Sequence, residues 1–320
     1  MLFDISCKGG NKMKIVGVDL GGTFVKIGLV NEKSGKILKK TTIETKVELG
    51  GKTVVKRIAE AITNLTNNDF YAVGIGSPGS IDKERGIVRF SPNFPDWHNF
   101  ELAPKLSKLL NKNVYVENDA NSFVLGEKWF GAGKGKKHIV ALTLGTGVGG
   151  GVISHNILIT GKDGIGAELG HVIINPNGPL CGCGNYGCLE AYASATAIVR
   201  MAKERRKKFP DSVIFKDEIT AKNIFEAVKL NDRLAVIIRN EVVEALSIGI
   251  TSFIHIFNPE VVIIGGGVSR AGEILFEPLR RRVEELVMPT FKGTYKIVQS
   301  PLVENAGILG AASIVLQREN

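Results

Sequence analysis

The stretch Ile15-Val16-Gly17-Val18-Asp19-Leu20-Gly21-Gly22-Thr23 decides the fold, because its pattern recurs later in the same chain. Its apolar run predicts a β-strand, and Gly21-Gly22-Thr23 predicts a tight turn. The residues from Phe24 to Val30 predict a returning strand, and a third strand is expected from Ile37 to Ile43. The unit therefore reads as strand, glycine turn, strand, strand.

The same unit returns from His138 onward, where Gly145-Thr146-Gly147 takes the place of Gly21-Gly22-Thr23. Strands are again expected afterwards, over Val148 to Ile153 and Ile157 to Ile159. Repetition of a whole supersecondary unit predicts an α/β protein of two related domains with an interdomain cleft. Cofactor and substrate sites prefer such clefts.

Periodicity predicts the remaining elements. Helices with apolar residues at i, i+3 and i+4 are expected over residues 54–65, 102–110, 193–207, 221–229, 234–257 and 306–316. Further strands are expected over residues 71–75, 114–117, 261–264 and 295–298. The run Gly76-Ser77-Pro78-Gly79-Ser80 predicts a glycine-rich loop after one of these strands.

Composition excludes several classes of protein. The chain has 320 residues, of which 44% are hydrophobic and 23% charged, which is typical of a globular protein of about two domains. No apolar run approaches the length of a membrane span, and no secretory signal pattern opens the chain. The net charge of +9 is scattered, and the runs Lys203–Lys208 and Arg280–Arg282 are typical of solvated helix faces, so no nucleic-acid partner is expected.

The first twelve residues match no periodic pattern. Codons for Lys8-Gly9-Gly10 can spell a purine-rich ribosome-binding sequence upstream of Met13. We therefore expect Met13 to be the natural start of the protein.

A dense group of metal-binding residue types lies in the second half of the chain. Three thiols fall within eight residues, and a histidine lies ten residues before the first of them: His171, Cys181, Cys183 and Cys188. A redox pair beside an unrelated histidine is the alternative, but CxC is a poor disulfide geometry and three is an odd number. The set predicts a closed structural zinc site. With three of the four cysteines used in this way, no disulfide is expected and a cytoplasmic protein is predicted.

Two carboxylates, Glu168 and Glu190, flank the metal-binding group. A metal that fixes this loop would also fix both carboxylates. The segment therefore predicts a rigid floor for a polar ligand.

Three glycine turns follow predicted strands: Gly21-Gly22-Thr23, Gly145-Thr146-Gly147 and Gly265-Gly266-Gly267. Amides in such turns can converge on phosphate oxygens, and glycine allows the phosphate to approach closely. The chain has no GxxxxGK[ST] motif, which excludes a P-loop. The run from Gly145 to Gly150 opens into a strand and not a helix, which excludes a dinucleotide-binding fingerprint.

These residues resemble the ROK family (repressors, unnamed reading frames and sugar kinases), and within it most of all the ATP-dependent glucokinases. The resemblance runs from Met13 to the C-terminus. Its carriers are Asp19–Thr23, Glu117–Asn121, Leu144–Gly151, Glu168–His171, Cys181–Glu190 and Gly265–Val268. It implies two actin-like (ribonuclease H-like) domains, a small one over residues 13–119 completed by 302–320, and a larger one over 120–301. It also implies a homodimer.

The resemblance implies phosphoryl transfer from MgATP to the 6-hydroxyl of glucose. Asp119 would be the catalytic base, and Asp19 would organise Mg²⁺ and its waters. Phosphate contacts are implied for Gly21, Gly22, Thr23, Gly145, Thr146 and Gly147, and adenosine contacts for Gly265, Gly266 and Gly267. Sugar contacts are implied for Gly79, Asn93, Asn118, Asp119, Glu168, His171 and Glu190.

Simpler interpretations exist for three of these residues. Asp119 after a strand also fits an Asx turn, and Glu190 fits a carboxylate in the first turn of a helix. Asn93 lies in a proline-rich loop, where asparagine commonly serves its own backbone.

The resemblance leaves the substrate and the activity partly open. N-acetylmannosamine, N-acetylglucosamine and fructose remain alternative substrates, and polyphosphate an alternative donor. A sugar-sensing repressor would need a DNA-binding segment ahead of Met13, where only twelve residues stand.

Overall fold

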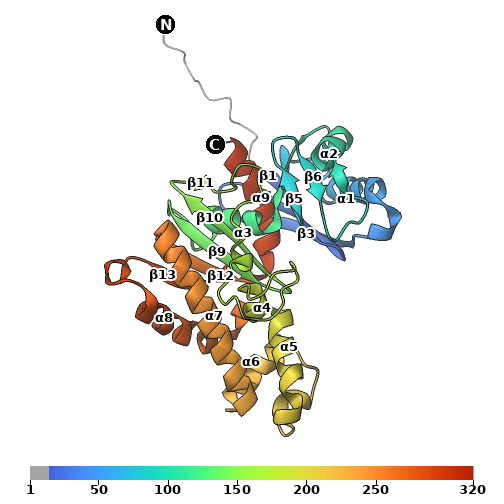
Figure 1. The fold of residues 1–320 in the computed structure, drawn as a ribbon. Coiled ribbons are helices and arrows are strands. Elements are labelled where there is room, and N and C mark those ends of the chain that lie inside the picture. Colours follow the sequence, from blue (N-terminus) through green and yellow to red (C-terminus); the bar gives the residue numbers. More distant parts are fainter. Residues whose placement is uncertain (1–13, 320) are drawn as a thin grey trace. The chain divides into compact units, whose positions relative to one another are not determined.

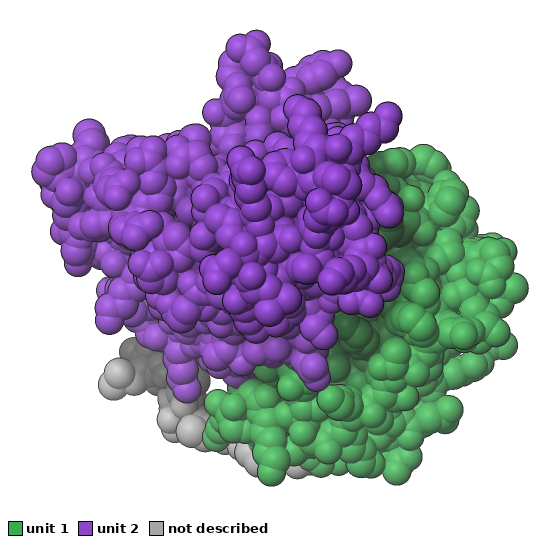
Figure 2. Space-filling model, turned by 90° about the horizontal axis from the view of Figure 1, so that it is seen from below, with its two compact units in different colours: residues 1–122, 305–320 green, residues 123–304 purple. Residues whose placement is uncertain are grey.

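The computed structural model describes residues 14–319, so the expectation about Met13 lies outside the described residues. The chain divides into two compact units, which Figure 2 colours separately. The first unit runs up to Ser122 and is completed by the stretch from Asn305, and the second unit is Phe123–Glu304.

The first unit is built on a five-stranded mixed sheet with the order β3-β2-β1-β4-β8 (Figure 1). Its strands are β1 (Lys14–Leu20), β2 (Phe24–Asn31), β3 (Ile37–Glu44), β4 (Ala72–Ser77) and β8 (Asn113–Asn118). Strand β1 pairs antiparallel with β2 and parallel with β4, and β4 pairs parallel with β8. The predicted strands of this half are confirmed.

Helices cover both faces of this sheet. Val16 and Val18 on β1 and Val73 and Ile75 on β4 share a core with α1 (Gly51–Thr66) and α2 (Leu102–Leu110). Glycines Gly17, Gly28 and Gly74 occupy the opposite face, where any Cβ would overlap α9 (Ala306–Glu319). Because side chains alternate along a strand, the missing Cβ atoms on that face let the backbone of α9 approach the sheet closely.

A small antiparallel sheet also belongs to the first unit. Its order is β5-β6-β7, with β5 (Ser80–Asp82), β6 (Ile87–Phe90) and β7 (His98–Phe100). The prediction of a loop over Gly76–Ser80 is therefore wrong at both ends, because β4 runs to Ser77 and β5 begins at Ser80. Only Pro78-Gly79 remains as a turn.

The second unit repeats the topology of the first. Its sheet has the order β11-β10-β9-β12-β13, formed by β9 (Ile139–Leu144), β10 (Val148–Ser154), β11 (Ile157–Leu158), β12 (Val261–Gly265) and β13 (Lys296–Gln299). Strand β9 pairs antiparallel with β10 and parallel with β12, as β1 does with β2 and β4. The predicted internal repeat is confirmed.

Helices of the second unit surround a large apolar core. They are α4 (Glu190–Ala193), α5 (Ala195–Arg205), α6 (Ala221–Lys229), α7 (Arg233–Phe257) and α8 (Glu273–Leu286). The predicted single helix over 193–207 is wrong at its start, because Ser194 is extended and separates α4 from α5. No helix within residues 14–319 combines the length and apolar character that crossing a bilayer requires.

Helix α3 (Asp119–Phe130) was not predicted as an element. Its residues from Asn121 to Glu127 are all buried, polar ones included, so it has no solvent-exposed face over that stretch. Hydrophobic periodicity depends on the contrast between a polar and an apolar face, which explains why the pattern gave no helical signal.

Candidate active site and metal cluster

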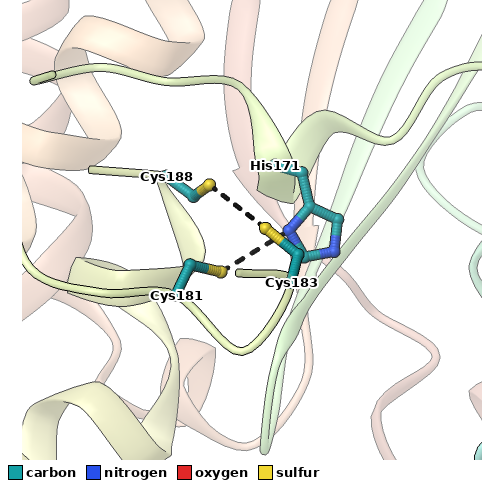
Figure 3. A group of neighbouring side chains, drawn as sticks. All are labelled: His171, Cys181, Cys183 and Cys188. Atoms are coloured by element: carbon teal, nitrogen blue, oxygen red, sulfur yellow. Dashed lines mark hydrogen bonds between the residues drawn. The ribbon is translucent and has the colours of Figure 1, made fainter. Parts of the chain in front are cut away.

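The predicted metal-binding residues come together in the second unit. His171, Cys181, Cys183 and Cys188 each offer a ligand atom, and all four atoms lie within 4.8 Å of one another. In Figure 3 the four side chains point toward a common centre. Cys181 Sγ lies 3.7 Å from His171 Nδ1, and Cys183 Sγ lies 3.7 Å from Cys188 Sγ.

These distances fit a tetrahedral zinc site. With Zn–S bonds of about 2.3 Å, two sulfurs on one tetrahedral ion lie about 3.8 Å apart. The backbone already has the tight form that such a loop needs, because the Cys181 amide donates to Asn185 O at 2.8 Å and the Gly184 amide to Cys181 O at 3.0 Å. The donor types, their number and their spacing therefore all fit zinc.

Glu168 lies beside this cluster, at the start of a short 3-10 turn, Leu169–His171. The His171 amide donates to the backbone carbonyl of Glu168 at 3.0 Å, which links the backbone of Glu168 to a metal-binding residue. The preceding residue, Ala167, has φ = 65°, a left-handed conformation that an L-residue adopts only at a cost. Backbone strain of this kind is commonly found next to functional side chains.

Glu190 connects the cluster to the turn after β9. Its Oε1 lies 3.3 Å from Cys181 Sγ, and its Oε2 accepts a hydrogen bond of 2.9 Å from the Val148 amide. A Cβ on Gly147 would overlap Glu190 Oε2, so any larger residue there would push the carboxylate out of this position. Glu190 is the first residue of α4, as the simpler interpretation has it, but its side chain has these specific partners as well.

The two glycine turns of the second unit lie next to each other. Gly145–Gly147 follows β9 and Gly265–Gly267 follows β12, and these strands are parallel neighbours. Gly266 has φ = 86°, and a Cβ there would lie 2.7 Å from the amide nitrogen of Leu144. Carboxyl ends of neighbouring parallel strands are where α/β sheets bind ligands.

In the first unit, predicted site residues also lie at the carboxyl ends of strands of one sheet. Asp19 is the last residue of β1 that pairs with β4, Asn118 is the last residue of β8, and Asp119 follows it. Burial raises the pKa of the Asp19 carboxyl, and Lys26, whose Nζ lies 3.8 Å away, partly opposes that rise. A carboxylate that is costly to ionise when alone is well placed to gain from a bound cation.

Asn118 caps helix α3. Its Oδ1 accepts hydrogen bonds from the amides of Ala120 at 2.9 Å and Asn121 at 3.3 Å, and its Nδ2 donates to Gly79 O at 3.1 Å. The cap places Asp119 at the first helical position with an exposed side chain, whose Oδ1 accepts from the Ala120 amide at 2.9 Å. The structure thus brings together Gly79, Asn118 and Asp119.

Asn93 lies against the first glycine turn. A Cβ on Gly22 would lie 3.2 Å from Asn93 Cβ and 3.5 Å from Asn93 Nδ2. The turn itself is closed by the Gly21 amide, which donates to Phe24 O at 3.0 Å. A residue predicted to contact the sugar therefore lies next to residues predicted to contact phosphate.

Sequence reasoning assigned no role to several residues at these sites. Glu117 is buried, and its Oε1 accepts from the Asn118 amide at 2.9 Å and from Asn121 Nδ2 at 3.1 Å. Gly307 at the start of α9 leaves room for the Asp19 carboxylate, which a Cβ would overlap. Glu117 was visible inside the quoted motif, whereas Gly307 gave no signal in the sequence.

Comparison with known families assigns the chain. The ROK family model matches residues 15–318. The chain belongs to the ROK family.

Individual relatives agree with this assignment. The chain is 60% identical to a glucokinase of Thermotoga maritima over 313 residues, covering 96% of this chain and 98% of that one. It is 33% identical to a xylose repressor of Caldicellulosiruptor bescii, covering 94% of this chain and 78% of the repressor. A crystal structure of a ROK family glucokinase from Streptomyces griseus with glucose and AMPPNP matches with a TM-score of 0.80 at 36% identity, covering 96% of this chain and all of that one.

Proposed function

We propose that this ROK protein transfers the terminal phosphoryl group of MgATP to the 6-hydroxyl of glucose. The observation that carries the proposal is Asp119, an exposed carboxylate held at the first position of α3 by the Asn118 cap. Transfer of a phosphoryl group to a hydroxyl requires a base positioned beside that hydroxyl more than it requires a covalent intermediate with the protein. The similarity to a Thermotoga maritima glucokinase supports glucose as the acceptor.

Asp119 would accept the proton of the sugar hydroxyl as its oxygen bonds to phosphorus. The bond from phosphorus to the oxygen that bridges to ADP breaks, and ADP leaves with that electron pair. Asp19 would organise the Mg²⁺ that accompanies ATP. Amides of Gly21–Thr23 and Gly145–Gly147 would stabilise charge on the phosphates, and Gly265–Gly267 would lie beside the adenosine.

The sugar would be held through its hydroxyls by amides, carboxylates and one imidazole. We assign these contacts to Gly79, Asn93, Asn118, Asp119, Glu168, His171 and Glu190. Carboxylates accept two hydrogen bonds from adjacent hydroxyls, which favours a polyol over a less hydroxylated ligand. Ala167, with its strained backbone, would hold Glu168 in place.

His171, Cys181, Cys183 and Cys188 would hold a structural zinc ion. Zinc supplies no step of the reaction there and acts by stabilising the fold of its loop. The loop residues hold Glu168 and Glu190 at its two ends, so the same ligands that bind the metal orient two sugar contacts. Reduced thiols are required for this role, which supports a cytoplasmic location.

A kinase assay over a panel of sugars and donors tests the proposed function. Purified protein should convert glucose to glucose 6-phosphate with ATP, with a higher kcat/KM than for N-acetylmannosamine, N-acetylglucosamine or fructose. The position of the phosphoryl group on the sugar product is determined by ³¹P and ¹³C NMR. Preference for another sugar, or for polyphosphate over ATP, would overturn the corresponding half of the proposal.

We also propose that the protein is a homodimer, as ROK kinases commonly are. Light scattering at micromolar concentration should give about twice the mass of the 34.5 kDa chain. A monomeric mass at that concentration would refute the dimer and leave the proposed reaction untouched.

A further inference from the structure

The segment from Glu190 to Thr196 contacts every residue of the turn after β9. Ala195 donates its amide to Gly145 O at 2.8 Å, and the Thr196 hydroxyl donates to Thr146 O at 2.8 Å. Glu190 accepts from the Val148 amide at 2.9 Å, and its carboxylate fills the space left by Gly147. None of the motifs in the sequence gives Thr196 a role.

Helix α5 supplies two of these contacts from its first turn. Ser194 caps the helix by accepting from the Ala197 amide at 3.1 Å. The first amides of a helix have no acceptor within the helix, and here the Ala195 amide donates to the carbonyl of Gly145 instead. Thr196, one residue further along, places its hydroxyl on the next carbonyl of the turn.

Anchoring the carbonyls of Gly145 and Thr146 also orients the amides that follow them. A peptide unit is planar, and its C=O and N–H point in opposite directions. Fixing the carbonyl of Gly145 therefore fixes the N–H of Thr146, and fixing the carbonyl of Thr146 fixes the N–H of Gly147. Glycine alone would leave these planes free to rotate.

Both of these amides lack an acceptor. Among residues 14–319, the N–H groups of Thr146 and Gly147 donate no hydrogen bond, although their neighbours do: Gly145 donates to Gly147 O and Val148 donates to Glu190. Two adjacent, oriented and unused amides form a site for an anion such as a phosphate oxygen.

We propose that Thr196 is a positioning residue for Gly145–Gly147, the phosphate turn, and acts through the peptide plane between Thr146 and Gly147. The proposal rests on the proposed role of Gly145–Gly147 in binding ATP. Thr196 itself touches no substrate. The Thr196 hydroxyl orients the Gly147 amide toward the phosphate position before ATP binds. Loss of this hydroxyl therefore lowers affinity for the nucleotide and leaves affinity for the sugar unchanged.

Isosteric substitution tests the proposal. Thr196→Val keeps the shape of the side chain and removes the donor, and Thr196→Ser keeps the donor. Calorimetry with AMPPNP should give a Kd about fivefold to tenfold weaker for the valine variant, the usual effect of one lost hydrogen bond. The serine variant should bind as the wild type does. Glucose affinity should be unchanged in both.

Thr220→Val is the matched control. Thr220 caps α6 elsewhere in the same unit by accepting from the Asn223 amide at 3.1 Å, so its loss lowers stability without touching the turn. It should leave AMPPNP affinity unchanged. If Thr196→Val bound AMPPNP as tightly as wild type, or lost glucose and AMPPNP affinity equally, Thr196 would have no positioning role.

Amide chemical shifts separate this proposal from the function on which it rests. Addition of AMPPNP to ¹⁵N-labelled wild type should shift the Thr146 and Gly147 amide signals. If they do not move, the phosphate role of the turn fails, and the role of Thr196 fails with it. If they move while Thr196→Val binds normally, the turn keeps its role and only the assignment to Thr196 is wrong.

Discussion

Gly307→Ala should reduce catalysis strongly while leaving the fold stable. Gly307 lies in the first turn of α9, where a Cβ would stand 2.9 Å from Asp19 Cβ and closer still to its carboxylate. Carbon atoms need about 3.5 Å, so the Asp19 carboxylate must retreat by roughly 1 Å. Misplacing a catalytic group by that distance costs about 10²-fold in kcat/KM, or about 2.7 kcal/mol.

Stability should change far less than activity. Alanine is favoured over glycine in a helix by about 1 kcal/mol, which offsets an overpacking cost of about 1–3 kcal/mol. Urea denaturation should therefore place Gly307→Ala within about 2 kcal/mol of wild type. Steady-state kinetics with varied Mg²⁺ should show the loss mainly in kcat/KM for ATP.

A double-mutant cycle with Asp19→Asn tests whether Gly307 acts through Asp19. Residues in contact give non-additive effects, so Gly307→Ala should cost little more once the Asp19 carboxylate is gone. If the two changes lowered kcat/KM additively, the contact between them would be irrelevant to catalysis and the reasoning would be refuted.

Three further predictions concern the metal cluster, a buried carboxylate and the phosphate turn. Purified protein should contain about one zinc per chain, and Cys183→Ser should lose the metal and bind glucose more weakly; unchanged glucose affinity without zinc would separate the cluster from the sugar site. Glu127 is fully buried and accepts from Ser300 Oγ, and burial raises the pKa of its carboxyl above 4.5. The stability that the protonated Glu127 carboxyl contributes is therefore complete below pH 4.5 and is lost as the pH rises through the raised pKa. The free energy of unfolding of wild type, relative to that of Glu127→Gln, should fall from pH 4 to 7. A difference between the two proteins that does not depend on pH would contradict this. Gly145→Ala adds a methyl that meets no atom within 4 Å in the protein, so it should fold normally yet raise KM for ATP by at least about tenfold through crowding of the phosphate; an unchanged KM would argue against a close approach there.

Strands and the repeat were the most predictable part of this fold. Buried strands such as β1, β9 and β12 are short apolar runs with a glycine at or directly after their last residue. This pattern involves only neighbouring residues and is therefore visible in the sequence. Helices with one polar face, such as α2 and α6, matched their predicted bounds for the same reason. Helix α8 escaped prediction, since Pro278 and the charged residues that follow it obscure its apolar face.

The metal-binding group could be predicted from the sequence because its residues lie close together in the chain and their types fit one kind of site. Contacts between residues distant in the chain could not be predicted. Gly17 and Gly74 look like ordinary strand glycines until α9 is found against them, and Thr196 looks like an ordinary helix residue until the turn after β9 is found beside it. Glycine and threonine have many uses, and only the partner identifies which use applies.

Turnover of Asp119→Asn tests the central claim most directly. The asparagine has nearly the same size as Asp119 and keeps the side-chain oxygen that accepts from the Ala120 amide, but it cannot take a proton at neutral pH. With glucose and MgATP the variant should bind glucose as wild type does, while kcat falls by at least about 10²–10⁴-fold. Near-normal kcat in Asp119→Asn would contradict the assignment of Asp119 as the catalytic base.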